Sequence, residues 1–449
     1  MKLNDLKDLL REMGVVGAGG AGFPSYAKLS PDADTIILNC AECEPLLKLH
    51  RQLLEEHTYE ILSALDMIVK EAGAKQGIIA LKSHFKETIE AVNAEISDFP
   101  ALSMCKLRAM YPSGDEIILI KEVTGKLVAP GALPISVGVV VCNVESVYNV
   151  YKAVNGKPVT DKYVTVAGEV KNPVTLHVPL GTKIADLLEA AGGLTCSDVA
   201  LISGGPMMGK MVRPGDVVTK TTNAIIALPA DHRVILNKNR NYSISLRRAM
   251  SVCCQCRSCT ELCSRHVAGY PVEPHMVMRV LSNGGKGDEK ALEGSLFCSG
   301  CGLCETYSCP QDLSPRALID QLKAERRARG EALPKGVAFD PDVKDADLKK
   351  VSVARLTLRL GLSKYDVDAP INHKFDTDMV KIPLSQHIGA PAVAIVKEGD
   401  TVSRGDVIAA AKEGALSVNI HASISGKVTA VNDKFVRIAK IQRKRIDSK

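Results

Sequence analysis

Short hydrophobic runs rich in β-branched residues alternate with longer amphipathic segments through the first 157 residues of the chain. The short runs are typical of buried strands, and the longer segments carry apolar residues at the three- and four-residue spacing of helices. The predicted strands are residues 35–40, 77–82 and 137–143, and the main predicted helices are residues 46–73 and 84–96. This alternation predicts an α/β layer with a largely parallel sheet.

The pattern changes after residue 157. Residues 158–240 hold two strand-like runs around an Asn-Pro turn and then a short helical segment, which predicts a small β-grasp-like domain. Residues 241–330 are rich in cysteine and helix formers, and residues 331–375 are typical of a polar connector. Short strands separated by Gly-Asp and Ser-Gly turns predict an all-β sandwich over residues 376–449. The expected fold class is therefore multidomain α/β.

Composition narrows the function classes. A chain of 449 residues corresponds to about three domains, and 46% hydrophobic residues suffice for real cores. The net charge of +6 is small, and the absence of Trp with only 4% aromatic residues argues against nucleic-acid binding. No window approaches the ~20 apolar residues that span a bilayer, and the N-terminus does not resemble a signal peptide. We therefore expect a cytoplasmic protein without a membrane span.

Nine of the 14 cysteines fall between residues 253 and 309. In a reducing compartment this clustering indicates metal binding or catalysis more often than disulfides. The two runs have the spacings C-x2-C-x2-C-x3-C and C-x2-C-x2-C-x4-C, so each offers three close thiols and one more. Zinc needs only two cysteine pairs per site, so the spacing favours two 4Fe–4S clusters over zinc sites.

In two-cluster ferredoxins the fourth Cys of each run binds the other cluster. That rule predicts one ligand set of Cys253, Cys256, Cys259 and Cys309, and a second set of Cys298, Cys301, Cys304 and Cys263. Cys254 is then a bystander. Arg257 and Arg265 could offset the negative charge of the clusters, but we expect them to be solvated.

A glycine-rich loop follows the first predicted helix. Gly17, Gly19, Gly20 and Gly22 allow a bulky ligand to approach the backbone and present N–H groups to a phosphate. The loop matches neither the G-x-G-x-x-G fingerprint nor a Walker A loop. On this segment alone, a turn that only packs helix against sheet is an equal alternative.

Three polar clusters lie where predicted strands end and helices begin. They are N-C-A-E-C-E-P at residues 39–45, Y-P-S-G-D-E at residues 111–116 and C-N-V-E at residues 142–145. Ligands of open α/β sheets bind at the carboxyl ends of the strands. Together with the glycine loop, these clusters suit a flavin with a dinucleotide beside it.

The combination of G-A-G-G-A-G-F-P with these three clusters resembles the flavin- and NADH-binding subunit of respiratory complex I. It is more similar to the family of RnfC, from the Rnf electron-transport complex, and PduS, the cobalamin reductase of propanediol metabolism. The resemblance covers nearly the whole chain and implies a flavin and NADH domain, a β-grasp (SLBB) domain, a helical dicluster ferredoxin domain and a C-terminal barrel-sandwich hybrid. The sandwich follows the clusters, as in PduS, and Ala415 stands where a lipoyl-type carrier would have its lysine.

The resemblance also implies roles for single residues. Contacts to the FMN phosphate and ribityl chain would come from Gly17, Gly19, Lys28, Asn39 and Asn143. The isoalloxazine would be flanked by Glu42 and Asp115, which follows Gly114, and the dinucleotide would face Phe23, Glu44 and Glu116. Acidic residues at the adenosine end would repel a 2′-phosphate, so we expect NADH rather than NADPH. Ala41 replaces an Asp of the complex I motif.

The function implied is transfer of a hydride from NADH to FMN, and then of single electrons through two 4Fe–4S clusters to a partner. The partner would be an electron-accepting protein or a cobalamin-dependent enzyme, and the function would be that of a cobalamin reductase. We expect the protein to belong to a larger complex, associated with a microcompartment or a membrane complex. An alternative is a diaphorase subunit that serves an enzyme such as methylenetetrahydrofolate reductase or an Rnf-type membrane complex. A second class of function is a non-catalytic, ferredoxin-like scaffold with a vestigial glycine loop.

Overall fold

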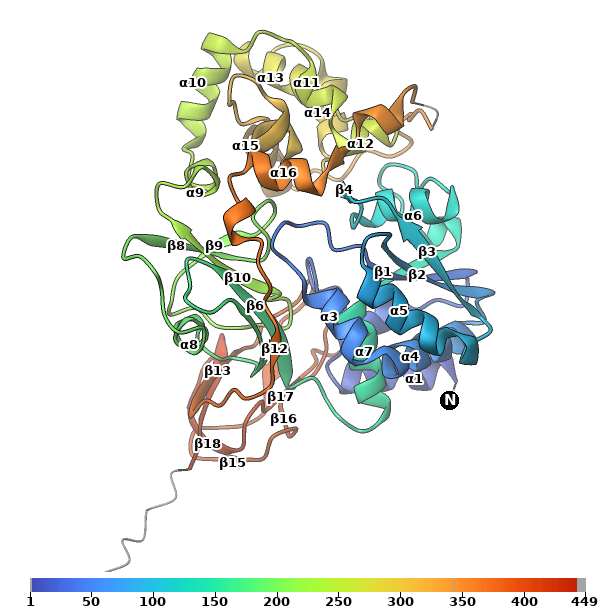
Figure 1. Cartoon of the computed structure of the whole chain (residues 1–449), viewed down its shortest axis with the longest axis vertical. Coiled ribbons are helices and arrows are strands. Elements are labelled where there is room, and N and C mark those ends of the chain that lie inside the picture. Colours follow the sequence, from blue (N-terminus) through green and yellow to red (C-terminus); the bar gives the residue numbers. More distant parts are fainter. Residues whose placement is uncertain (1, 342, 442–449) are drawn as a thin grey trace, which may run out of the picture.

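A computed structural model of the chain describes residues 2–341 and 343–441 (Figure 1). The last part of the predicted domain 376–449, residues 442–449, lies outside the described residues. The remainder forms an N-terminal α/β domain, a β-grasp domain, a helical cysteine domain and a C-terminal sandwich, in that order (Figure 1). The expected multidomain α/β fold is confirmed.

The N-terminal domain is built on a parallel sheet with the strand order β3-β2-β1-β5. Its strands are β1 (Thr35–Cys40), β2 (Gln76–Lys82), β3 (Leu102–Leu107) and β5 (Val139–Asn143). Its helices are α1 (Leu3–Glu12), α2 (Ser25–Lys28), α3 (Leu49–Glu56), α4 (Thr58–Ala72), α5 (Lys86–Glu95), α6 (Glu116–Thr124) and α7 (Val144–Val154). The sequence prediction missed β3, because residues 103–106 of this edge strand are exposed or only partly buried and do not form a hydrophobic run.

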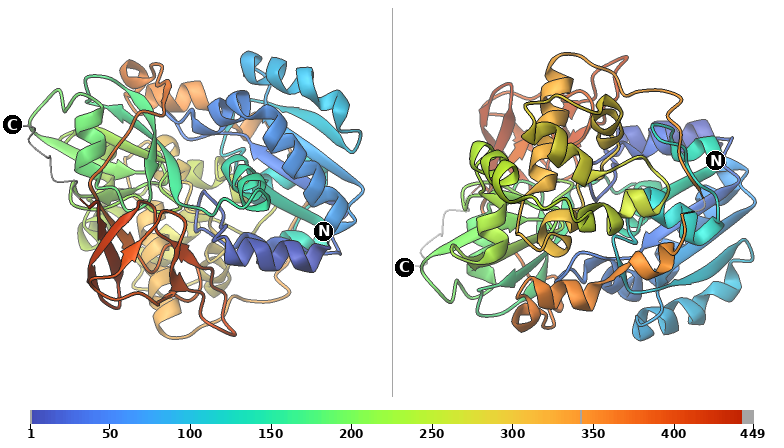
Figure 2. Two further views of the ribbon diagram at one scale, coloured as in Figure 1. Left: turned by 90° about the horizontal axis from the view of Figure 1, so that it is seen from below. Right: turned by 90° about the horizontal axis from the view of Figure 1, so that it is seen from above.

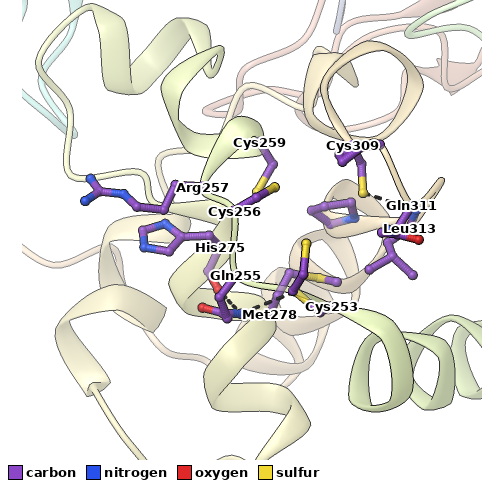
Figure 3. Close-up of a pocket in the computed structure, with 13 residues that line it drawn as sticks. Cys253, Gln255, Cys256, Arg257, Cys259, His275, Met278, Cys309, Gln311 and Leu313 are labelled. Carbon is purple, nitrogen blue, oxygen red and sulfur yellow. Dashed lines mark hydrogen bonds between the residues drawn. The ribbon is translucent and has the colours of Figure 1, made fainter.

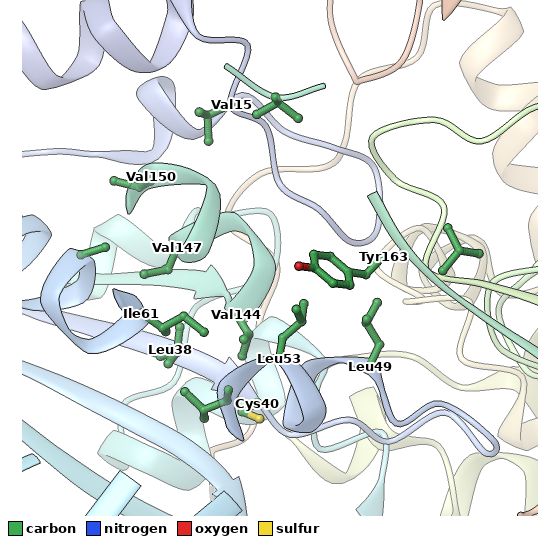
Figure 4. Close-up of a cluster of buried hydrophobic side chains, with 14 of the residues drawn as sticks. Val15, Leu38, Cys40, Leu49, Leu53, Ile61, Val144, Val147, Val150 and Tyr163 are labelled. Atoms are coloured by element: carbon green, nitrogen blue, oxygen red, sulfur yellow. The ribbon is translucent and has the colours of Figure 1, made fainter. Parts of the chain in front are cut away.

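The two faces of this sheet pack against different partners. Leu38 of β1 joins a core with Ile61 of α4 and Val147 of α7 (Figure 4). The adjacent residue Ile37 points to the opposite face, where it joins α6 and side chains of the cysteine domain such as Tyr270. The sheet therefore lies between its own helices and the cysteine domain.

The β-grasp domain carries a mixed sheet with the order β12-β7-β6-β10-β8-β9. Its elements are β6 (Asp161–Gly168), β7 (Val174–Pro179), α8 (Ile184–Ala190), β8 (Val199–Ser203), β9 (Lys210–Val212), β10 (Ala224–Pro229) and α9 (Arg233–Lys238). As predicted, β6 and β7 pair antiparallel around the Asn172-Pro173 turn.

Residues 331–375 do more than connect two domains. Their strand β11 (Val351–Ser352) pairs with β4 (Met110–Tyr111) of the N-terminal domain and leads into α16 (Val353–Arg359). Their strand β12 (Ile371–Asn372) then extends the β-grasp sheet beside β7. The segment expected as a polar connector thus holds two domains together.

The cysteine domain consists of short helices joined by loops. They are α10 (Tyr242–Val252), α11 (Ser258–Glu261), α12 (Ser264–Val267), α13 (Pro274–Ser282), α14 (Glu289–Ser295), the π-helical turn η3 (Cys304–Ser308) and α15 (Pro315–Ala328). The segment between the two cysteine runs forms α13 and α14. Among the described residues, no helix is long and apolar enough to cross a membrane.

The C-terminal sandwich has two small sheets, β13-β19-β18-β15 and β14-β16-β17, around one apolar core. Its strands are β13 (Met379–Pro383), β14 (Val393–Ala394), β15 (Thr401–Val402), β16 (Val407–Ala410), β17 (Ile420–His421), β18 (Gly426–Val431) and β19 (Phe435–Ala439). It packs beside the β-grasp domain (Figure 2), where Arg404 pairs with Asp161 at 2.6 Å. It also reaches the glycine loop, because the Ile388 N–H donates to the Ala21 carbonyl at 3.0 Å.

Candidate functional site

A cavity of about 590 Å³ opens at the carboxyl ends of β1 and β5. Its volume lies in the range of small-molecule and cofactor sites. All residues predicted to bind FMN or NADH line it except Asp115: Gly17, Gly19, Gly20, Gly22, Phe23, Lys28, Asn39, Glu42, Glu44, Gly114, Glu116 and Asn143. The fold therefore brings the glycine loop and the three polar clusters to one place.

The glycine loop forms one wall of this cavity. Its ends are closed by the Gly17 N–H, which donates to the Phe23 carbonyl at 2.8 Å. Gly22 has a positive φ of 69°, and a Cβ there would lie 2.7 Å from the Thr221 side chain of the β-grasp domain. Glycine is required because the loop is pressed between two domains, which leaves backbone rather than side chains to face the cavity.

Two asparagines set the polar edge of the cavity. The Asn39 side chain donates to the Gly114 carbonyl at 3.0 Å, which ties the first polar cluster to the second. Asn143 caps α7, because its side-chain oxygen accepts from the Glu145 N–H at 3.0 Å. The first bond ties the end of β1 to the segment after β4, and the second directs the Asn143 amide nitrogen away from α7.

Lys28 brings a positive charge to the cavity. Its ammonium group lies 3.0 Å from a Glu116 carboxylate oxygen and donates to the Val141 carbonyl at 3.1 Å. Both side chains are about one-third exposed, so the pair is accessible to a ligand. A bound phosphate could take the place of the Glu116 carboxylate beside this lysine.

The carboxylates Glu42 and Glu44 are held by backbone N–H groups. Glu42 accepts from His50 at 2.8 Å, and burial raises the pKa of its carboxyl above the usual value. Glu44 accepts from Met207 and Met208 of the β-grasp domain at 2.9 and 2.8 Å, and burial also raises its pKa. Glu44 thus contributes to the docking of a second domain as well as to the cavity wall.

Asp115 does not line the cavity. Its carboxylate caps α6 by accepting from the Ile117 N–H at 3.1 Å and pairs with Arg265 at 2.7 Å. Arg265 is only 13% exposed, and it follows Cys263 by two residues in the cysteine domain. The expectation that Arg265 is solvated was wrong, because this carboxylate compensates its charge. Arg257 is 55% exposed, as expected, and pairs with the nearby Glu261.

One predicted ligand set surrounds a single pocket at the outer side of the cysteine domain. Cys253, Cys256, Cys259 and Cys309 line it, and the exposed Cys254 lies at the same pocket (Figure 3). We call these four residues the outer cysteine set. Burial and the neighbouring thiols raise the pKa of Cys259 to about 12, whereas hydrogen bonding with Ser258 lowers the pKa of the exposed Cys256.

The other predicted ligand set lies between the cysteine domain and the N-terminal domain. Its members are Cys263, Cys298, Cys301 and Cys304, which we call the inner cysteine set. Cys263 and Cys298 pack into the core that also holds Ile37 and α6, and Cys301 packs beside Tyr111. Burial, together with the neighbouring Cys301 thiol, raises the pKa of Cys298 to about 11.

The side chains present fit the groups that the sequence indicates. Four cysteines around one place are the donor set of a 4Fe–4S cluster, and a glycine-lined cavity with a lysine suits a flavin phosphate. Within residues 2–341 and 343–441, no group of three or more His, Cys, Asp or Glu side chains is arranged to hold a single metal ion.

Comparison with known proteins matches each of the four domains to a known domain family. Residues 10–152 match the Nuo51 FMN-binding domain, residues 163–210 the SLBB domain, residues 252–314 the 4Fe-4S dicluster domain and residues 362–444 the RnfC barrel sandwich hybrid domain. Cobalamin reductase PduS of Salmonella typhimurium is 38% identical over 98% of this chain and 97% of its own length. The chain belongs to the PduS family.

Other members and relatives agree with this assignment. PduS of Citrobacter freundii is 39% identical over 96% of both chains. A subunit of the Na(+)-translocating ferredoxin:NAD(+) oxidoreductase complex of Acetobacterium woodii is 31% identical over 60% of this chain and 59% of its own. An NAD+-reducing NiFe-hydrogenase shares the fold, with a TM-score of 0.50 and 20% identity over 80% of this chain and 67% of that one. The resemblance drawn from the motifs is confirmed, and this PduS-family member is a flavin and iron–sulfur oxidoreductase.

Sequence reasoning missed the cavity residues that come from outside the recognised motifs. Asn223 of the β-grasp domain and His50 of α3 both line the cavity. The His50 ring nitrogen lies 3.0 Å from the Asn143 amide, and burial lowers the pKa of His50 to about 4, so the ring is neutral. No local sequence pattern predicts that Asn223 lines the cavity, because it lies 80 residues beyond Asn143 in another domain.

Proposed function

We propose that this PduS-family protein oxidises NADH and passes the electrons singly to a cobalamin acceptor. NADH gives NAD+, a proton and two electrons, and two one-electron reductions of cob(III)alamin or cob(II)alamin consume them. When bound, FMN accepts a hydride and gives up single electrons, which an iron–sulfur cluster can take. The cobalamin acceptor is suggested by the names of the relatives that match this chain end to end.

One loop carries this proposal. Residues 111–115 join the cavity to the inner cysteine set, because Gly114 lines the cavity and the Tyr111 hydroxyl donates to the Cys301 carbonyl at 2.7 Å. The ion pair between Asp115 and Arg265 fixes the same loop to the segment after Cys263. The geometry supports a path from the cavity to the inner set, and then to the outer set near the surface.

The residues of the cavity would bind and orient the cofactors. Lys28 and the glycine N–H groups provide positive charge and donors for a phosphate. Phe23 stands at 36% exposure on the cavity wall, where it can cover an aromatic ring. Glu44 and Glu116 keep negative charge close to the dinucleotide, which favours NADH over NADPH. Equal rates with both nucleotides would contradict that preference.

A second candidate is a diaphorase subunit of a larger redox complex. It is favoured by the similarity to the Acetobacterium woodii subunit, although that similarity covers only 60% of the chain. The end-to-end match with PduS makes cobalamin the better acceptor. In either case we infer that the protein works within a larger complex, in a microcompartment or at a membrane.

The test uses the full chain, reconstituted anaerobically with FMN, iron and sulfide. We expect about eight irons per chain, as two 4Fe–4S clusters require, bleaching of the flavin by NADH, and NADH-dependent reduction of cob(III)alamin. Cys254→Ser is the matched control for Cys256→Ser, because only Cys256 belongs to the outer cysteine set. A chain that binds no flavin after reconstitution would support the scaffold and refute the enzyme.

A further inference from the structure

A buried ion pair lies behind the cavity wall and has no part in the function described so far. Lys162 of β6 contacts Glu145 of α7, and both side chains are only 2% exposed. The pair joins the β-grasp domain to the N-terminal domain. Burying two charges is costly unless further hydrogen bonds satisfy them. Glu145 also accepts from the Tyr163 N–H, and Lys162 donates to Asn223.

The bond from Lys162 fixes the orientation of the Asn223 amide. The ammonium group donates to the Asn223 side-chain oxygen at 2.7 Å, and an ammonium group has no acceptor to offer. The oxygen of Asn223 must therefore face Lys162, and its NH2 group faces the other way. Because Asn223 lines the cavity, this NH2 group is a donor presented to the ligand. The adjacent positive charge polarises the amide and strengthens that donor.

Two amide donors converge on the glycine loop. A Cβ on Gly19 would lie 3.4 Å from the Asn223 amide nitrogen and 3.5 Å from that of Asn143. The Asn143 oxygen is already occupied by the first N–H groups of α7, so its nitrogen is also directed away from the helix. This arrangement suits an anionic oxygen, since backbone N–H groups, a helix start and two amide donors meet there.

We propose that Asn223 donates a hydrogen bond to the phosphate of FMN, and that Lys162 is the positioning residue that orients it. This inference rests on the proposed function, because it requires FMN in this cavity. It makes the β-grasp domain part of the flavin site rather than a spacer. Flavin binding would then be coupled to the docking of that domain, since one donor comes from each side of the domain boundary.

The test compares the affinity for FMN with the affinity for riboflavin, which lacks the phosphate. We expect Asn223→Ala to weaken FMN binding by about tenfold to a hundredfold, the range for one hydrogen bond to a charged group. Riboflavin binding should change by less than about twofold, because the lost donor faces only the phosphate. Asn223→Asp keeps a partner for Lys162 but places a carboxylate towards the phosphate, so its FMN affinity should fall further. Asn172→Ala, at an exposed turn of the same domain, is the matched control and should bind FMN like the wild type.

Lys162→Met tests the positioning role. It should lower FMN affinity, without a matching loss for riboflavin, because the Asn223 amide is no longer oriented. Thermal unfolding identifies any variant that fails to fold, and Asn223→Ala leaves the ion pair itself in place. Unchanged FMN affinity in folded Asn223→Ala, or an equal loss for FMN and riboflavin, would overturn the proposal. Absence of FMN binding by the wild type would instead refute the proposed function.

Discussion

Three members of the outer cysteine set and three members of the inner set have the same C-x2-C-x2-C spacing, but the two sets have very different surroundings. Cys256 of the outer set is exposed, like its neighbour Cys254, and the other three members of the set are partly buried. Cys301 and Cys304 of the inner set are buried, and Cys263 packs into the core under the sheet of the N-terminal domain. Two similar motifs therefore lie in different environments, because the outer set is accessible to solvent and the inner set is largely buried.

The difference assigns different tasks to the two sets. A buried cluster beside the cavity can receive electrons without contact with solvent or other acceptors. An exposed cluster can deliver electrons to a partner, because the partner must approach it closely. Solvent exposure and hydrogen bonds to the sulfurs also set the potential of a cluster. We therefore expect the inner set to act as the entry and the outer set as the exit.

The largest expected effect comes from removing one ligand of each set. Cys301→Ser should lower the rate of NADH-dependent cob(III)alamin reduction by more than about 100-fold, because the first cluster of the electron path is lost. NADH should still bleach the flavin. Cys256→Ser should also stop reduction of cobalamin, but its inner cluster should still be reduced by NADH. Steady-state rates together with flavin absorbance and EPR of the inner cluster distinguish the two variants; equal behaviour would remove the distinction between entry and exit.

The next effect concerns the ion pair that docks the inner set. Arg265→Met leaves the mostly buried Asp115 carboxylate without its charge partner, and breaking such a pair costs about 3–5 kcal/mol. The midpoint of thermal unfolding should fall by several degrees. Arg257→Met is the matched control, because its exposed pair with Glu261 is worth less than about 1 kcal/mol. Similar midpoints for both variants would show that the Arg265 pair does not hold the domains together.

The two clusters should also be lost at different rates when iron is removed. A chelator or oxygen reaches exposed thiolates and sulfides first, so the outer cluster should be lost several times faster than the inner one. The measurement is the time course of the two cluster signals in EPR spectra under a chelator, with Cys256→Ser to assign the signals. Loss of both clusters at one rate would contradict the difference in exposure.

The smallest effect is a single hydrogen bond at the inner set. Tyr111→Phe removes the hydroxyl that donates to the Cys301 carbonyl and should lower the free energy of unfolding by about 1–2 kcal/mol. Tyr26→Phe serves as control, since the Tyr26 hydroxyl has only a long 3.4 Å contact with the Ser417 N–H. Denaturant unfolding of both variants gives the comparison, and an unaffected Tyr111→Phe would show that this contact contributes nothing.

The sequence predicted what depends on local pattern. The β-branched runs predicted β1, β2 and β5, and the cysteine spacing predicted which thiols the structure groups together. The sequence could not predict the buried ion pair of Arg265, because its partner Asp115 lies 150 residues away. The place of Asn223 in the cavity wall and the hydrogen bonds of Glu44 to backbone N–H groups could not be predicted either, because both arise only when two domains pack together. The sequence analysis also missed β3, because pairing with β2 rather than burial defines this edge strand.

We expect electrons to leave the flavin cavity through the inner cysteine set. The most direct measurement is rapid-freeze EPR of the reconstituted Cys301→Ser variant after mixing with NADH. We expect a reduced flavin and an outer cluster that stays oxidised on the timescale of wild-type turnover. Reduction of the outer cluster at the wild-type rate would contradict it.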